Sequence, residues 1–197
     1  ATAQGGRWVN GPKIGFFRAL SEGLGQALDE LPIIAEDLGD DLAGAIALRH
    51  RLNLPGMAIL QFAFSAYEGS DNRFLPPNHE TNMIVYTGTH DNNTTWGWWT
   101  CESSEGERNH LRHYVGQDEI TEPNWTLIEL GMGSRANTLV IPLQDVLGLG
   151  GSARMNKPGV PAGQWRWRCL PGDLPEDIRG TPWERLGKLT RAHHRAP

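Results

Sequence analysis

Four short apolar runs constrain the fold of this chain more than any other feature of its sequence. Each run is nearly continuous in apolar residues, as parallel strands are when both faces of their sheet are covered. The runs occupy residues 31–35, 57–62, 83–87 and 138–143. We therefore predict four buried parallel strands.

Helical patterns lie between and after these runs. The clearest covers residues 38–53, where only Arg49 interrupts an apolar stripe at helical spacing. Asp40 and Asp41 would lie in its first turn, where the helix dipole favours negative charge, and Asn53 would mark its end. Further helices are predicted over residues 105–115, 125–136 and 182–196.

Alternating strands and helices indicate an α/β fold with a parallel sheet, and both a doubly wound sheet and a (β/α)8 barrel fit this pattern. No Gly-x-Gly-x-x-Gly follows any of the runs, which disfavours a nucleotide-binding sheet. A barrel takes about 250 residues, so four strands correspond to about half of one. The 197 residues suit one domain.

Composition excludes several classes of function. A net charge of -5 argues against nucleic-acid binding, which needs a basic face. No apolar run approaches the roughly 20 residues that span a membrane, and no signal peptide is visible. Cys101 and Cys169 match no metal or redox spacing, so a reducing, cytoplasmic setting is expected. The chain opens on Ala1 in loop-like sequence, which suggests processing or a fragment.

Polar clusters follow three of the four predicted strands, at residues 36–37, 89–93 and 144–145. Active sites of barrel enzymes form at these carboxyl ends. Two carboxylates facing one pocket suit glycosidic-bond chemistry, because one protonates the leaving oxygen while others stabilise positive charge at the anomeric carbon.

Structural roles are open for the same residues. Glu36 could pair with an arginine, Asp91 could cap a turn, and Asp145 could hold the loop after its strand. His90 beside Asp91 suggests a metal site, but no second histidine-rich strand end supports one. The eight tryptophans include Trp96 in a polar stretch, where core packing and sugar stacking are both reasonable interpretations.

Several motifs resemble the 4-α-glucanotransferase family, which includes the amylomaltases and disproportionating enzymes. Ala-Glu-Asp-Leu-Gly at residues 35–39 and Tyr-Thr-Gly-Thr-His-Asp-Asn at residues 86–92 are the most specific. Weaker matches run in family order over nearly the whole chain, at residues 6–12, 54–57, 61–64, 98–99, 154–159 and 165–168.

This resemblance implies a (β/α)8 barrel with insertions that cuts an α-1,4-glucan and passes the piece, with retention, to the 4-hydroxyl of an acceptor sugar. Glu36 matches the general acid/base, Asp91 the carboxylate that stabilises the transition state, and His90 the neighbouring sugar-binding histidine. Burial of Glu36 near other carboxylates would favour the protonated form that it needs. Further substrate-binding candidates are Asp37, Asn92, Phe62, Phe64, Asn78 and Trp96. The expected ligand is a maltooligosaccharide or α-glucan, with no cofactor or metal.

The chain departs from the family pattern in two respects. The family's nucleophilic aspartate lies on the fourth barrel strand, before the matching region, so we expect residues 1–197 to hold strands five to eight and to lack the nucleophile and the N-terminal half. The isolated chain is then expected to be inactive, with the N-terminal half as a partner. Asn93 also stands where the family commonly has Asp, and the loop at residues 75–79 differs from the usual pattern.

Two alternatives to a glucanotransferase fragment are compatible with the sequence. An α-glucan hydrolase would use water instead of a sugar as acceptor, which the sequence does not distinguish. A non-catalytic half-barrel that binds sugar or a partner half belongs to another class of function.

Overall fold

The structure is a computed structural model that describes residues 5–7, 9–39, 42–65 and 69–195. The chain divides into two compact units, Ala1–Met57 and Ala58–Pro197. Each unit has a core of its own and is described by itself.

Unit 1 contains helices α1 (Ile14–Leu24) and α2 (Ala43–Arg51). Helix α1 was not predicted, although its residues Ile14, Phe17 and Leu20 form a stripe that packs against the buried core of the unit. Helix α2 is shorter than the predicted 38–53; it ends before Asn53, which adopts a φ of 52°, a conformation that few residues other than glycine and asparagine tolerate. Asp40 and Asp41 lie outside the described residues.

The strand predicted over residues 31–35 is absent, and this prediction was wrong. The amides of Ile33 and Asp37 donate to carbonyls two residues back in the same segment, whereas the amide of Ala35 donates to Pro55 O at 2.9 Å. These local bonds take the donors that a strand ladder would use. Exposure nevertheless alternates along the segment, with Ile33 and Ala35 packed on the core of the unit while Ile34 is exposed.

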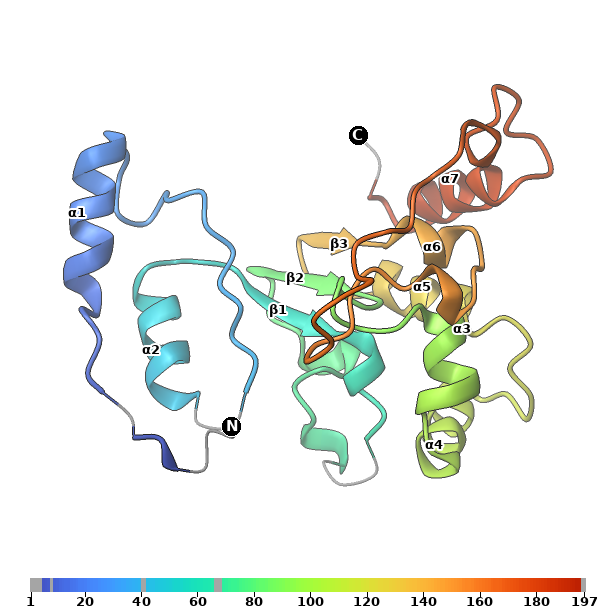
Figure 1. Cartoon of the computed structure of the whole chain (residues 1–197), viewed down its shortest axis with the longest axis horizontal. Helices are drawn as coiled ribbons and strands as arrows, with labels where there is room; N and C mark the ends of the chain where they lie inside the picture. Colours follow the sequence, from blue (N-terminus) through green and yellow to red (C-terminus); the bar gives the residue numbers. More distant parts are fainter. Residues whose placement is uncertain (1–4, 8, 40–41, 66–68, 196–197) are drawn as a thin grey trace. The chain divides into compact units, whose positions relative to one another are not determined.

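Strands β1 (Gly56–Ile59), β2 (Met83–Tyr86) and β3 (Thr138–Val140) form a three-stranded sheet in the order β1-β2-β3 (Figure 1). β2 and β3 are parallel, with Ile84 opposite Thr138 and Tyr86 opposite Val140. Three of the four predicted strands are thus confirmed in shortened form. β3 is not buried on both faces as expected, because it lies at one end of this sheet with Thr138 and Val140 exposed.

The helices of unit 2 cover this sheet and carry the loops of the candidate site. They are α3 (Thr95–Gly97), α4 (Glu105–Val115), α5 (Pro123–Met132), α6 (Leu143–Val146) and α7 (Pro182–Ala192). α4 has the predicted bounds, whereas α5 and α7 are shorter than predicted. A π-helical turn (Trp98–Glu102) connects α3 to α4.

Gly131 allows α5 to pack closely against β3. A Cβ added there would lie 2.6 Å from Cδ1 of Leu139 on β3, so only glycine fits without displacing that side chain. The main core of the unit gathers Phe64, Val85 and Leu127, and a second cluster lies between α5, α6 and α7. Figure 1 shows α5 and α6 below α7 in this part of the chain.

The described residues hold neither a membrane-spanning helix nor a metal-binding cluster. None of their helices is long and apolar enough to cross a membrane. Within the same residues, no group of three or more His, Cys, Asp or Glu side chains is arranged to hold a metal ion.

Candidate active site

A buried ion pair fixes the backbone around Glu36 in unit 1. Asp37 Oδ2 lies 3.2 Å from Arg49 Nε of α2, and both side chains are almost fully buried. Asp37 Oδ1 accepts the Met57 amide hydrogen at 2.9 Å. Gly56 leaves room for this pair, since a Cβ there would lie 2.6 Å from Asp37 Oδ2. Asp37 was predicted to bind substrate, but its side chain is committed to these buried contacts and is not available to a sugar.

Glu36 itself is exposed, so the burial expected for it is not found. Its neighbour Asp37 is buried, so the two consecutive side chains lie in different environments. The sequence left open a pairing of Glu36 with an arginine; the arginine of this region, Arg49, pairs with Asp37 instead. Glu36 is thus an exposed carboxyl group on a backbone that its buried neighbour Asp37 holds in place.

In unit 2, Asp145 anchors the polar loop that follows β2. Its carboxylate accepts hydrogen bonds from Thr87 Oγ1 at 2.5 Å, Thr95 N at 2.7 Å and Thr95 Oγ1 at 2.8 Å. Burial raises the pKa of Asp145, while the three donors act in the opposite direction. The interpretation of Asp145 as a loop-holding residue is therefore the one the structure supports.

Asn92 shapes the turn that presents the histidine and aspartate. Its Oδ1 accepts from Thr89 N at 2.9 Å and from Thr89 Oγ1 at 2.8 Å, which closes the turn around residues 89–92. Gln61, just after β1, donates from Nε2 to Asn93 O at 2.9 Å. Gly88 makes this approach possible, because a Cβ there would lie 2.6 Å from Gln61 Nε2.

His90 and Asp91 are brought together at the tip of this loop. Their side chains are 53% and 46% exposed, and His90 Nε2 lies 3.4 Å from Asp91 Oδ1. Asn156 donates from Nδ2 to Asp91 Oδ1 at 2.6 Å and from its amide to His90 O at 3.1 Å. Asp91 is thus oriented by a partner 65 positions away in the chain while part of its carboxylate faces solvent.

Arg154 links the loop at residues 154–156 to the loop that follows β2. Its Nη2 donates to Asp91 O, its Nη1 to Glu102 Oε1 and its Nε to Asn156 O, each at 2.7 Å. Asn93 Nδ2 donates to the same Glu102 oxygen at 2.9 Å. Asn93, which stands where the family commonly has Asp, therefore supplies a donor that an aspartate could not.

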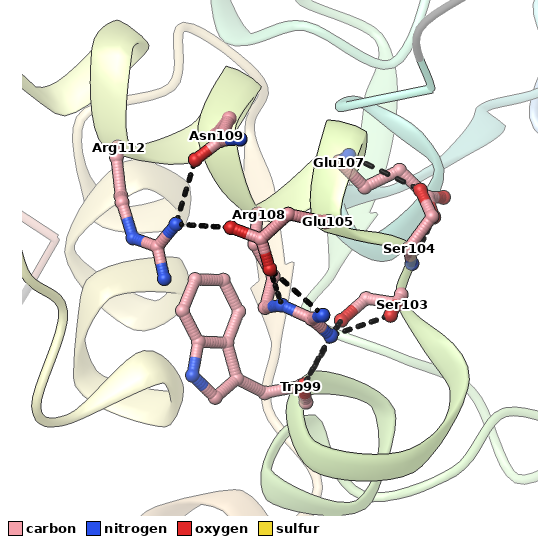
Figure 2. Close-up of polar contacts among 8 residues, drawn as sticks. All are labelled: Trp99, Ser103, Ser104, Glu105, Glu107, Arg108, Asn109 and Arg112. Carbon is pink, nitrogen blue, oxygen red and sulfur yellow. Dashed lines mark hydrogen bonds and ion pairs between the residues drawn. The ribbon is translucent and has the colours of Figure 1, made fainter.

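The π-helical turn that carries Glu102 is held by the N-terminal network of α4 (Figure 2). Arg108 donates from Nη1 to Ser103 O at 2.6 Å and to Trp99 O at 3.2 Å. Glu105 accepts from both Arg108 and Arg112, and these bonds lower the pKa of its carboxyl group. Figure 2 shows the Arg112 side chain beside the Trp99 indole, with the guanidinium carbon 5.6 Å from the ring centre.

The remaining predicted substrate contacts lie in different environments. Phe64 is fully buried in the core, between the rings of His110 and Tyr114, so its assignment to a cleft wall is corrected to a packing role. Asn78 Nδ2 donates to the carbonyls of Ser70 and Asn72 and shapes that loop.

Phe62 and Trp96 keep some exposed surface. Phe62 is 41% exposed and packs edge-on against Phe74. Trp96 is half-buried against the main core, and its indole lies near Gly148.

Arg154, Asn156 and Trp165 belong to motifs singled out in the sequence, but no role followed from them there. Trp165 packs against the His90 ring with 5.1 Å between ring centres. Their only sequence signal was the family resemblance, because a loop contact across about 65 residues leaves no local pattern.

Exposed acidic and imidazole side chains on loops after the strands of a parallel sheet are typical of α/β enzymes whose active site lies at the carboxyl ends of the strands. A family profile described as 4-alpha-glucanotransferase (glycoside hydrolase family 77) matches residues 1–172, and the chain belongs to this family.

Known relatives match most of the chain. It is 43% identical over 192 residues to the chloroplastic/amyloplastic 4-alpha-glucanotransferase of Arabidopsis thaliana, covering 96% of this chain and 32% of the relative. It is 46% identical over 180 residues to the 4-alpha-glucanotransferase of Thermus thermophilus, covering 88% and 35%. The chain thus spans about a third of the length of these relatives.

A solved structure is similar over the full chain. The amylomaltase from Streptococcus agalactiae in complex with acarbose aligns with a TM-score of 0.86 and 29% identity, covering 100% of this chain and 38% of that one. The amylomaltase from Corynebacterium glutamicum aligns with a TM-score of 0.60 at 18% identity, over 87% of this chain and 30% of that one, which bears on the fold alone.

Proposed function

We propose that residues 1–197 provide part of the active site of a retaining 4-α-glucanotransferase, with Glu36 as general acid/base and Asp91 as the carboxylate that stabilises the transition state. We further propose that the chain corresponds to strands five to eight of a (β/α)8 barrel. Family membership and the similarity to an amylomaltase that holds acarbose support both proposals.

The observation that carries the proposal is the geometry of Asp91. A carboxylate that stabilises an oxocarbenium-like centre must be ionised, accessible and fixed in direction. Asp91 is 46% exposed, and Asn156 donates to one of its oxygens at 2.6 Å. The amide donor fixes the direction of one oxygen and leaves the second oxygen for sugar hydroxyls.

Glu36 supports the proposal through accessibility. In the first step it would give its proton to the leaving glycosidic oxygen, and in the second it would take the proton of the incoming 4-hydroxyl. Both steps need a carboxyl group that reaches substrate on a rigid backbone. The exposed Glu36 beside the anchored Asp37 meets this requirement.

Other residues have supporting roles in this proposal. His90, Asn92, Phe62 and Trp96 remain proposed substrate contacts, whereas Asp37 and Asn78 hold the backbone. The nucleophile is proposed to come from a segment other than residues 1–197, since the chain spans about a third of its relatives.

A transfer assay with maltotriose tests the proposal. Released glucose and longer maltodextrins are measured for the chain alone and for the chain mixed with the N-terminal part of the Thermus thermophilus relative. Activity is expected in the mixture only and is lost with Glu36→Gln. Glu30→Gln, which changes another exposed glutamate of the same unit, should leave the activity unchanged.

The other outcomes discriminate between the alternatives. Transfer by the chain alone would mean that one of its own carboxylates, such as the exposed Asp91, acts as nucleophile. Glucose without longer products would indicate a hydrolase. Transfer activity that survives Glu36→Gln would refute the acid/base assignment. No transfer activity in any mixture would favour a non-catalytic binding function.

A further inference from the structure

Trp165 has a backbone conformation that a bulky residue rarely adopts. Its φ is 60°, and the other non-glycine residues with positive φ in the described chain are Lys13, Asn53 and His194. For a large side chain this left-handed conformation is strained, and it persists only where the surroundings impose it. Glycine would adopt the same backbone without that strain.

The surrounding loop does impose this conformation. The Trp165 amide donates to Met155 O at 2.7 Å, and Arg168 Nη1 donates to Trp165 O at 2.8 Å. Between these points, the Lys157 amide donates to Gln164 Oε1 at 2.8 Å and closes the base of the loop. Gly159 and Gly163, both with φ of 81°, provide the turns.

Burial does not account for this arrangement, because the indole is 50% exposed. One part of it packs on the His90 ring at 5.1 Å with an interplanar angle of 36°, and the rest faces solvent. The same loop supplies Arg154 and Asn156, which hold Asp91. A strained backbone therefore keeps an apolar ring exposed beside a histidine and a carboxylate.

This combination has the chemistry of a pyranose site. A glucose ring offers an apolar C–H face that packs on an indole, while its hydroxyl groups donate to carboxylates and bond to imidazole. We propose that Trp165 is a sugar-stacking residue that holds one glucosyl ring of an α-1,4-glucan against the His90–Asp91 pair. The inference rests on the proposed function and names a contact that was not among its predicted residues.

The test uses the full chain and maltoheptaose as the probe, because neither binding nor stability requires catalysis. The 15N-labelled indole signal of Trp165, identified by its absence in Trp165→Phe, reports whether the wild-type ring is contacted, and the Kd of every variant is measured by calorimetric titration. Trp165→Gly removes the ring together with the backbone strain, whereas Trp165→Phe keeps an aromatic face. Val160→Ala is the matched control, because it shortens another exposed apolar side chain of the same loop.

We expect Trp165→Gly to raise the Kd about five- to tenfold, Trp165→Phe to stay within about twofold, and Val160→Ala to leave it unchanged. In urea, Trp165→Gly should be as stable as the wild type or more so, since the strain is relieved. Asp91→Asn separates this inference from the proposed function. Weaker binding in Asp91→Asn with unchanged binding in Trp165→Gly would overturn the inference alone, and the reverse would support it while contradicting the role of Asp91.

Two further outcomes overturn the inference. Loss of stability in Trp165→Gly, with the stability of Trp165→Phe unchanged, would assign the ring to packing. A wild-type chain that shows no shift of the Trp165 signal with maltoheptaose at millimolar concentration would exclude a glucan site at this residue.

Discussion

Gly56→Ala is expected to destabilise unit 1 because it intrudes on a buried ion pair. The added Cβ would lie 2.6 Å from Asp37 Oδ2 and 3.0 Å from Arg49 Cζ and Nε, closer than ordinary van der Waals contact. Overpacking a buried site costs about 1–3 kcal/mol, and breaking a buried ion pair costs about 3–5 kcal/mol. Since the pair must shift without being removed, we expect about 3 kcal/mol, where the two ranges meet.

Hydrogen exchange at the Met57 amide measures this effect locally. That amide donates to Asp37 Oδ1, so it is exposed when the pair moves. A loss of about 3 kcal/mol should accelerate its exchange roughly 150-fold in the limit where opening is fast and reversible. Gly44→Ala in α2 is the control, because a Cβ there meets nothing within 4 Å and alanine favours the helix.

A double-mutant cycle shows whether the clash acts through the pair. In an Asp37→Ala background the clashing oxygen is gone, so Gly56→Ala should cost much less than in the wild type. Equal costs in both backgrounds, or a Gly56→Ala chain whose Met57 amide exchanges at the wild-type rate, would refute the reasoning.

Three further predictions concern unit 2. Asn93→Asp places a second carboxylate next to Glu102, so unfolding at pH 7 should cost about 1 kcal/mol less than in the wild type, and the difference should shrink below about pH 4 as the carboxylates protonate. Arg154→Lys keeps the charge but cannot make all three hydrogen bonds of the guanidinium group. The free energy of opening this loop should fall by about 1–2 kcal/mol, measured as faster hydrogen exchange of the Asn156 amide. Burial lowers the pKa of His79 in the folded chain, so stability is full above its unfolded pKa of about 6.5 and falls as the pH drops below that value; a stability profile of His79→Gln should lose this slope.

The sequence predicted the elements whose signals are local. Helix α4 was correct to the residue because Ser104 and Glu107 form a capping box and Gly116 ends the helix. Strand β2 was correct because its apolar run is bounded by polar turns. Helix α1 was missed although Ile14, Phe17 and Leu20 form a stripe at helical spacing; its two glycines, Gly15 and Gly23, lower the helix propensity of the segment.

Contacts between distant segments were beyond sequence reasoning. Residues 31–35 look like a strand from their apolar side chains, but the amides of Ile33 and Asp37 bond locally. Asp37 is a predicted substrate contact beside Glu36, and only the arrangement of α2 reveals its partner Arg49. His90 and Asp91, which are adjacent in the sequence, lie in contact at the tip of one loop, and their roles stay predictions.

The span between Asp91 and Asn156 also has a kinetic consequence. Their hydrogen bond closes a loop of 65 residues that contains α3, α4, α5 and β3, so its formation must wait for contacts that shorten this loop. Changes in the 154–168 segment should therefore accelerate unfolding of unit 2 while leaving its folding rate almost unchanged. A chain that emerges from the ribosome would acquire its ordered carboxylate among the last events of folding, after the sheet on which the loops stand.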